Sequence, residues 1–397
     1  MHPRVDTMKS PSPSEVVSTR ENTATGYSAR HLMQDLTMRL TTPFVATALF
    51  ATALAACVGE YGERPCKGRS TGTCDGSGSG SDAGSGSDGD CEQINHAVTI
   101  ASPADFDSLP KGCWDLYGPL TITGSQVTSL AKLGNLIGIN ALEIVGTGLT
   151  TLDAPEALHV YGAVTIQDNA SLTNLKNLIV EKASNLLNEV VIDNNPQLAS
   201  LDGLGDLTMT DGNFTVTRNA KLGSVSLFRL SQVGGALRFT DNTALTSLDV
   251  SRIELVGRVE VINNAGLTTF MGLTASQING DVLIRGNRAL TSLGTMSALT
   301  RIGGSLTIDD NDALTDITAF TTSMQYVNGT VIITNNGALA ALGQISHFVQ
   351  IGSLNISSNA NLSSCRAREV AVCVSVPGSI TILNNKSASN CSSWCGR

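Results

Sequence analysis

The chain has 397 residues and a formal net charge of −9, and only 15% of its residues are charged and 4% aromatic. A pI near 5.0 and the lack of a basic cluster in the repeated part argue against a nucleic-acid partner. Few charges together with 39 glycines are typical of a surface made of strand faces and tight turns.

The first 56 residues are predicted to contain a targeting signal, a lipoprotein signal peptide over residues 38–56. Residues 1–37 are polar and show no sustained hydrophobic period, so we expect a disordered or over-extended N-terminus. Whether Met1 or Met38 is the true start stays open. Residues 38–56 end in an apolar run that has the length of a signal-peptide core and is short for a bilayer span. A buried core helix is the alternative for this run.

The run closes with Leu54-Ala55-Ala56-Cys57, which resembles the lipobox of bacterial lipoproteins. The resemblance implies that Cys57 is lipidated and that Val58 after it directs the protein to the cell outer membrane. We therefore expect a lipid-anchored protein, periplasmic or surface-exposed, that needs no spanning helix. Residues 57–90 include a Gly/Ser/Asp-rich tract that predicts a flexible tether, because it cannot bury a core.

Residues 91–397 contain a repeat with a period of 22 to 26 residues. Each copy has two apolar residues separated by one residue that is usually polar, which predicts a short strand with one buried face. The second residue of each pair is called the anchor here. The anchors are Ile100, Ile122, Ile144, Ile166, Ile192, Val216, Phe239, Val261, Ile284, Ile308, Ile333, Ile356 and Ile382.

Two further columns accompany the anchor. Four residues before it most copies carry glycine, for which we expect a left-handed turn at the entry to the strand. Three residues after it most copies carry asparagine, whose side chain can bond backbone groups that a bend leaves unpaired. We expect this asparagine ladder to be structural and not a ligand site. Its members are Asn169, Asn195, Asn219, Asn242, Asn264, Asn287, Asn311, Asn336, Asn359 and Asn385.

Apolar residues also recur six and nine positions after the anchor, as at Leu172 and Leu175. Each copy therefore sends a second apolar segment into the same interior. Stacking the copies at the inter-strand spacing of about 4.8 Å predicts an all-β fold, a β-solenoid of about thirteen coils.

Nine cysteines are present, and eight remain once Cys57 is set aside for lipidation. Two of the eight precede the repeat, two lie at its start and four lie at its end. Since a solenoid has open ends that need covering, we interpret them as disulfides that cap the stack in an oxidising compartment. On the N-terminal side we expect the pairs Cys66–Cys74 and Cys91–Cys113.

The C-terminal side carries Cys365, Cys373, Cys391 and Cys395. Two arrangements stay open, Cys365–Cys373 with Cys391–Cys395, or a crosswise pairing. A zinc site at Cys391 and Cys395 is a further alternative, although secretion favours the disulfide.

The cysteine-bounded ends and the motif G-x-L-x-I-x-x-N-x-x-L-x-x-I, seen over residues 304–317, resemble the receptor L-domain family. The resemblance implies a right-handed, leucine-rich-repeat-like β-helix that binds ligands on an exposed sheet face. The chain departs from the receptors in having about thirteen coils and no cysteine-rich module, spanning helix or kinase. Only the fold is therefore carried over.

Side chains of opposite sign fall on neighbouring coils and predict cross-strand ion pairs. The pairs are Arg238 with Glu260, Arg258 with Asp281, and Arg285 with Asp309. One interpretation is that they set the register of the coils, each contributing less than about 1 kcal/mol. The other is a charged patch that contacts a partner. A separate threonine column, which includes Thr246 and Thr268, differs from the Thr-x-Thr arrays of ice-binding solenoids, because the residue two places later is apolar.

The search for catalytic motifs finds no nucleophile elbow, zinc-protease motif or phosphate-binding loop. The sequence therefore predicts no enzymatic activity, cofactor or metal. The alternative is a carbohydrate-active β-helix enzyme of the lyase or hydrolase type, using carboxylates between Asp281 and Asp316, among them Asp309, Asp310 and Asp312. We favour a lipid-anchored recognition or adhesion protein that binds a protein or polysaccharide through a sheet face. The ligand, and the choice among adhesion, sensing and envelope structure, stay open at this level.

Overall fold

The structure is a computed structural model that describes residues 91–181, 188–343, 348–388 and 391. The segments 1–37, 38–56 and 57–90 lie outside the described residues. So do the lipidation site Cys57, the pair Cys66–Cys74, and Cys395.

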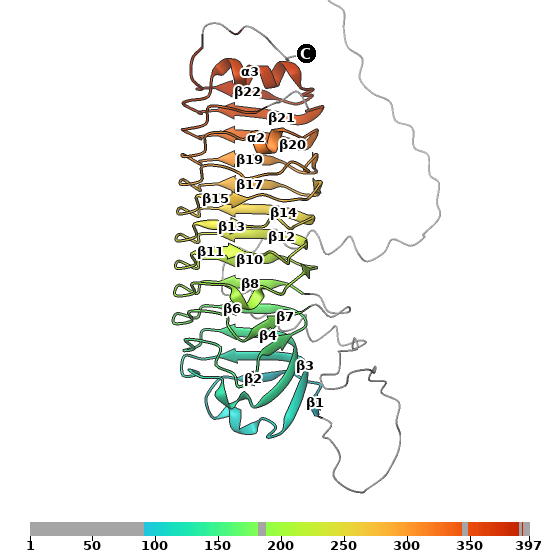
Figure 1. Ribbon diagram of the computed structural model, residues 1–397, viewed down its shortest axis with the longest axis vertical. Coiled ribbons are helices and arrows are strands. Elements are labelled where there is room, and N and C mark those ends of the chain that lie inside the picture. The colour runs from blue at the N-terminus through green and yellow to red at the C-terminus, as the bar shows by residue number, and fades with distance from the viewer. Residues whose placement is uncertain (1–90, 182–187, 344–347, 389–390, 392–397) are drawn as a thin grey trace, which may run out of the picture. The chain divides into compact units, whose positions relative to one another are not determined.

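The alternating apolar pairs form strands that stack in parallel, which confirms the predicted β-solenoid (Figure 1). Anchor lies opposite anchor in successive coils, as in the register of Ile122 with Ile144 and of Ile144 with Ile166. The anchor strands are β2 (Val98–Ile100), β3 (Cys113–Thr123), β4 (Asn135–Val145), β6 (Val164–Gln167), β8 (Val190–Asp193), β10 (Phe214–Thr217), β12 (Gln232–Thr240), β14 (Leu255–Ile262), β17 (Val282–Arg285), β19 (Leu306–Asp309), β20 (Tyr326–Thr334), β21 (Gln350–Ser357) and β22 (Ile380–Leu383).

Shorter elements complete each coil. Six strands extend the large sheet on the side that precedes the anchors: β1 (Glu92–Ile94), β5 (Leu158–Val160), β7 (Leu178–Val180), β9 (Met209–Thr210), β16 (Gln277–Ile278) and β18 (Arg301–Ile302). A separate parallel sheet contains β11 (Ser224–Ser226), β13 (Ser247–Asp249) and β15 (Thr269–Met271). The helical segments are η1 (Asp105–Ser108), η2 (Ala131–Leu133), η3 (Asp202–Leu204), α2 (Thr318–Thr321) and α3 (Ser364–Cys373).

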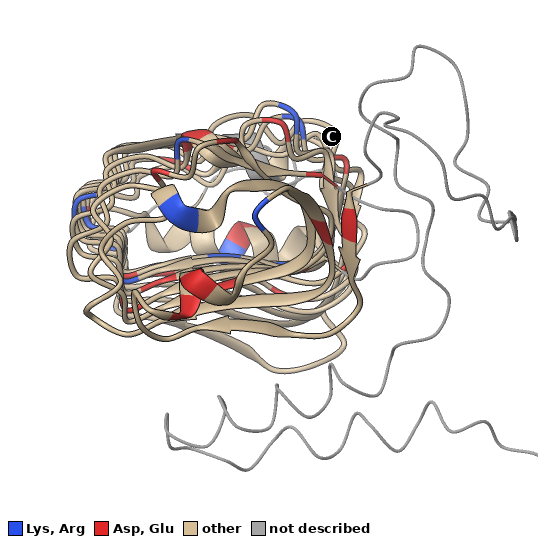
Figure 2. Cartoon of the chain, turned by 90° about the horizontal axis from the view of Figure 1, so that it is seen from below, with Lys and Arg blue, Asp and Glu red and all other residues tan. Residues whose placement is uncertain are grey.

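The interior is a continuous apolar column. Viewed along the stack, the coils superpose into a ring around it (Figure 2). Anchors such as Ile308 and the residues six places later, such as Leu314, are completely buried. Burial of one such side chain contributes about 1.5–3 kcal/mol relative to an exposed one. Aromatic anchors fit the same column, since the ring of Phe239 stacks 6.1 Å from that of Phe214 in the preceding coil.

The asparagine ladder lies inside the bend that follows each anchor strand. The Nδ2 group of Asn219 donates to the main-chain oxygen of Ile192 at 2.9 Å. Its Oδ1 accepts from the main-chain N–H of Asn195 at 3.0 Å and from the Nδ2 group of Asn195 at 3.2 Å. The pattern repeats from coil to coil, and every member except the last is fully buried. In the coil before the first asparagine, Thr147 takes the same place and bonds Oδ1 of Asn169.

The predicted left-handed turn at the glycine column is wrong. Most described residues with positive φ lie instead two places after the anchor, just ahead of the ladder position. These are Gly124, Gly146, Asp168, Asn194, Arg218, Asp241, Asn263, Gly286, Asp310, Asn335, Ser358 and Asn384. This conformation turns the next residue inward. Asparagine, aspartate and glycine predominate there because they tolerate positive φ best.

The glycine column has a different physical reason, which is the close approach of successive coils. A Cβ atom on Gly257 would lie 2.6 Å from the main-chain oxygens of both Gly234 and Gly235. On Gly352 it would lie 2.6 Å from the oxygen of Gly329. Since real Cβ contacts are not this short, each glycine makes room for the backbone of its neighbour.

The C-terminal end departs from an all-strand pattern. Helix α3 begins after Ser363, whose hydroxyl accepts from the N–H of Cys365 at 3.2 Å. It buries Ala367 and Val370 against the core column. The repeat did not predict this helix, because its apolar spacing is weak and Val and Cys have low helix propensity.

Disulfides tie down both ends of the coil stack. Cys91 is bonded to Cys113, which joins β1 to the start of β3 and agrees with the predicted pair. Cys365 at the start of α3 is bonded to Cys391. Cys373 is also disulfide-bonded. The arrangement with Cys365–Cys373 is therefore excluded, and the crosswise alternative fits.

Candidate functional site

Six outward side chains on neighbouring strands form what we call the charged face: Arg238, Arg258, Glu260, Asp281, Arg285 and Asp309. The strands place them in register, because Arg238 lies opposite Glu260 and Arg285 lies opposite Asp309. Arg258 and Asp281 are neighbours by the same register, since the residues that follow them, Val259 and Val282, are paired. The backbone stacking thus brings all six predicted residues into adjacent coils.

The first half of the charged face is a continuous chain of ion pairs. Arg238 Nε lies 2.5 Å from a carboxylate oxygen of Glu260, and Arg258 reaches the other oxygen at 3.2 Å. Arg258 also bonds Asp281 at 2.8 Å. The second oxygen of Asp281 accepts the N–H of Ser305 at 2.8 Å, so this carboxylate also anchors the next coil.

Glu260 is the centre of this chain. Only 9% of the residue is exposed, and this burial by itself would raise the pKa of its carboxyl group. The hydrogen bonds and charges of Arg238 and Arg258 outweigh burial and hold the pKa below its ordinary value. Glu260 therefore stays ionised, and the two guanidinium groups are held in fixed positions at the surface.

The second half is the pair between Arg285 and Asp309, with 3.2 Å between Nε and the carboxylate oxygen. Asp309 also accepts from the hydroxyl of Thr334 at 2.7 Å and from the amide of Asn335 at 2.9 Å. Its side chain is only 15% exposed, whereas that of Arg285 is 60% exposed. The arginine is thus the group that this pair presents to solvent.

The carboxylates of the enzymatic alternative are engaged in structural contacts. Asp310 and Asp312 both pair with Arg288, at 3.1 and 3.7 Å. Asp316 accepts the N–H of Thr318, the first residue of α2, at 3.1 Å. Asp309 is held as described above. Each of these aspartates therefore has a structural partner, either in a neighbouring coil or at the start of α2.

The sequence did not predict the ion pairs of Arg288, nor the pair between Arg218 and Asp193. Arg218 lies in the left-handed corner position and pairs with Asp193 of the preceding coil, which also accepts from the hydroxyl of Thr217. The hydrogen bond to Asp193 raises the pKa of the Arg218 guanidinium above its ordinary value. This pair occurs once, so no repeated column of charges signals it.

The threonine column also has a structural role. The hydroxyl of Thr246 donates to the main-chain oxygen of Gly223 at 2.8 Å, and that of Thr268 donates to the oxygen of Thr246 at 3.0 Å. Their hydroxyl protons thus bond the backbone of the preceding coil. This column is therefore another hydrogen-bond ladder between coils.

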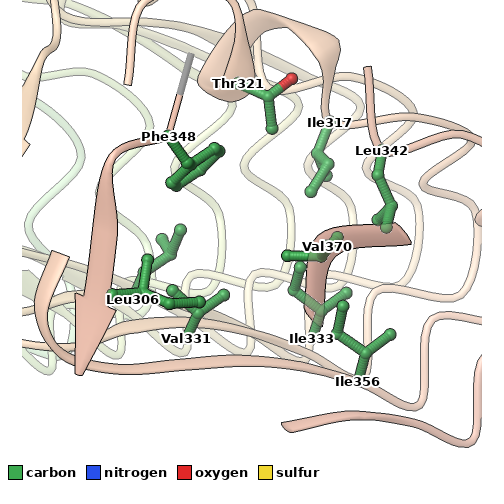
Figure 3. Close-up of a pocket in the computed structure, with 10 residues that line it drawn as sticks. Leu306, Ile317, Thr321, Val331, Ile333, Leu342, Phe348, Ile356 and Val370 are labelled. Carbon is green, nitrogen blue, oxygen red and sulfur yellow. The ribbon is translucent and has the colours of Figure 1, made fainter. Parts of the chain in front are cut away.

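Two cavities in the described part of the chain lie apart from the charged face. One lies inside the C-terminal coils, between Leu306, Val331, Phe348 and Val370, with about 20 Å³ of space (Figure 3). Its walls are carbon apart from the hydroxyl of Thr321, and it has room for a single water at most. The other is a shallow hollow of about 170 Å³ near Phe106 and Lys132 in the first coils. The charged face lies in neither of them.

In the part of the chain that the structure describes, no three His, Cys, Asp or Glu side chains gather where they could hold a metal ion. Over the same ranges, no helix is both long enough and apolar enough to cross a bilayer.

The fold and the charged face define a class, a parallel β-solenoid with fixed charge pairs on its outer strands. The chain is similar to the protein ecm33 of Aspergillus fumigatus, with 28% identity over 262 residues. The similar region makes up 55% of this chain and 63% of that protein, so the chain spans less than two thirds of this relative. No family model matches the chain, and no solved structure matches it.

Proposed function

We propose that the protein is a non-enzymatic recognition or adhesion protein of the cell surface, which contacts its partner through the charged face. The observation that supports this most is the exposure of Arg238, Arg258 and Arg285 on a rigid sheet while their carboxylate partners are more covered. Fixed donors lose little conformational entropy on binding, and such preorganisation favours recognition.

We expect a partner that is not itself strongly charged, because the charged face has no net charge. Three arginines and three carboxylates balance there, so long-range attraction to a strongly charged polymer is weak. A protein surface with alternating charges, or a polysaccharide rich in hydroxyl groups, fits this arrangement. The resemblance to the receptor L-domain family supports ligand binding through a sheet face. The proposal includes this resemblance and a right-handed winding of the coils.

The same proposal includes a lipid anchor at Cys57 in the cell outer membrane, with the solenoid held away from it by residues 57–90. Metabolic labelling with palmitate tests this part. Wild-type protein incorporates the label, and Cys57→Ser yields an unprocessed, unlabelled precursor. Equal incorporation in the two would remove the anchor from the proposal.

Photo-crosslinking on intact cells tests the recognition face. A photoreactive phenylalanine replaces Leu283, which lies opposite Glu260 on the charged face, or Ser247 on the separate sheet as a control. We expect a discrete crosslinked partner from position 283 that is lost when Arg285→Ala is added. Crosslinks of equal yield from both positions would contradict the proposal.

The enzymatic alternative has its own test. Purified protein is incubated with a panel of polysaccharides, and both binding and chain length are measured. The proposal expects no cleavage. Cleavage that Asp309→Asn and Asp310→Asn abolish would overturn the non-enzymatic assignment.

A further inference from the structure

A second outward row runs along the coils on the other side of the glycine column. It contains Gln232, Leu255, Gln277, Arg301, Tyr326 and Gln350, and we call it the amide strip. Each member lies opposite the next in the parallel register, directly for Gln232 with Leu255, Gln277 with Arg301, Arg301 with Tyr326, and Tyr326 with Gln350. Leu255 and Gln277 are neighbours because the residues after them, Val256 and Ile278, are paired.

The amide strip has a rigid backing. The residue that follows each member in its strand points inward and is buried in the core column, namely Val233, Val256, Ile278, Ile302, Val327 and Ile351. Six consecutive coils at about 4.8 Å make a row of about 24 Å. The outward side chains therefore stand at a fixed, regular spacing along the solenoid axis.

The side chains of the strip have hydrogen-bonding capacity to spare. Leu255 is 44% exposed, and Gln277, Arg301 and Gln350 are exposed as well. Asn140, Asn188 and Asn213 bond neighbouring coils; for example, the side-chain oxygen of Asn213 accepts the N–H of Ala236. The amides of Gln277 and Gln350, in contrast, have no side-chain hydrogen bond among the described residues, so both retain free donors and acceptors.

Arg301 and Tyr326 form the centre of the strip. The guanidinium carbon of Arg301 lies 5.8 Å from the centroid of the Tyr326 ring, and one of its nitrogens donates to the side-chain oxygen of Asn328 at 3.2 Å. This cation–π contact and the hydrogen bond hold a planar donor beside a half-exposed aromatic ring. A flat hydrophobic face next to planar polar groups is complementary to a pyranose ring, which has C–H groups on its faces and hydroxyls around its edge.

The charge of the strip selects among polysaccharides. It carries no carboxylate, and Arg301 is its single charged member, already bonded to Asn328 and stacked on Tyr326. The chain as a whole is acidic, with a net charge of −9, which opposes the approach of a polyanion. Uncharged hydroxyl groups therefore match the free amides better than uronate or sulfate groups do.

From these observations we propose that the amide strip binds an extended neutral polysaccharide strand that lies along the solenoid axis. The glutamine amides bond successive hydroxyl groups, and Leu255 and Tyr326 contact the sugar faces. This site is separate from the charged face and does not rest on the proposed function. A protein partner at the charged face and a glycan at the strip are compatible.

Affinity electrophoresis of the intact secreted chain tests the site. Native gels contain laminarin, xyloglucan, galactomannan or dextran as neutral probes, and alginate or polygalacturonate as acidic ones. Variants Tyr326→Ala and Gln277→Ala remove strip contacts. Phe228→Ala is the matched control, because Arg229 lies 5.7 Å from the centroid of the Phe228 ring, which is 56% exposed outside the strip.

At least one neutral probe is expected to retard the wild-type chain, with little change when the salt concentration is raised. Tyr326→Ala and Gln277→Ala each weaken binding about three- to tenfold, while Phe228→Ala does not. Circular dichroism confirms that each variant is folded. Retardation by acidic probes alone, by none of the probes, or equally in wild type and Tyr326→Ala overturns the inference and leaves the charged-face proposal untouched.

Discussion

The side-chain oxygen of Asn219 accepts two hydrogen bonds from Asn195, one from its main-chain N–H at 3.0 Å and one from its side-chain amide at 3.2 Å. Both residues are fully buried. Each asparagine side chain therefore forms hydrogen bonds with main-chain groups of the coil before it that would otherwise have no partner. The ladder thus couples the coils along the stack.

Asn219→Ala is expected to lower the free energy of unfolding more than any surface change. The substitution leaves the N–H of Asn195 without its acceptor and the oxygen of Ile192 without the amide donor. Each buried unsatisfied group costs about 1–3 kcal/mol. Urea denaturation followed by circular dichroism measures the difference. Asn361→Ala, at an exposed asparagine outside the ladder, should change stability by less than about 0.5 kcal/mol. Equal effects of the two substitutions would contradict the structural role of the ladder.

Gly257→Ala is expected to destabilise the solenoid for a steric reason. The added methyl group would lie 2.6 Å from two main-chain oxygens of the preceding coil, so the coils must move apart locally. Overpacking of this kind costs about 1–3 kcal/mol. Gly223→Ala is the matched control, since nothing lies within 4 Å of the position of its methyl group. A melting temperature for Gly257→Ala equal to that of Gly223→Ala would show that the coils do not approach each other here.

Stability should fall as the pH is lowered through the acid range, in part because of Glu260. Its pKa in the folded protein lies below its ordinary value of 4.5. The ionised form therefore stabilises the fold at a pH above the unfolded value, and this contribution is lost as the pH falls through the folded pKa. Urea midpoints measured from neutral to acid pH should fall less steeply for Glu260→Gln than for wild type. Identical slopes would mean that Arg238 and Arg258 do not hold the carboxylate.

The disulfide pairing at the C-terminal end can be determined by peptide mapping of the unreduced protein. Peptide mapping without reduction should yield a linked pair of peptides that contain Cys365 and Cys391. Because this bond fixes the start of α3, Cys391→Ser should make the last coils more accessible to limited proteolysis while the N-terminal coils stay protected. Recovery of a Cys365–Cys373 peptide instead would refute the crosswise arrangement.

The repeated features of the fold could be predicted from the sequence, and the single ones could not. Anchors such as Ile308 occur in every coil. The repeated position can therefore be recognised in the sequence, although one copy alone would not identify it. The charge pair of Arg285 with Asp309 then follows from the register. Helix α3 and the pair of Arg218 with Asp193 occur once, and no column signals them.

The glycine column shows a different limit. Glycine is favoured both where φ is positive and where two backbones approach each other, and a sequence does not separate the two reasons. Gly257 belongs to the second case, since a Cβ there would meet the preceding coil, whereas the left-handed corner is occupied by residues such as Asn263. Only the three-dimensional arrangement of successive coils distinguishes them.

The central claim is that the coils stack in one continuous register, so that their outward residues form straight rows. Pulsed electron paramagnetic resonance on spin labels at Thr121, Thr215 and Thr307 tests this most directly, because these outward residues lie in the same row on β3, β10 and β19. Four coil steps separate each neighbouring pair. The account predicts about 19 Å for Thr121 to Thr215 and for Thr215 to Thr307, and about 38 Å for Thr121 to Thr307, within the reach of the labels. A distance from Thr121 to Thr307 well below the sum of the other two would contradict it.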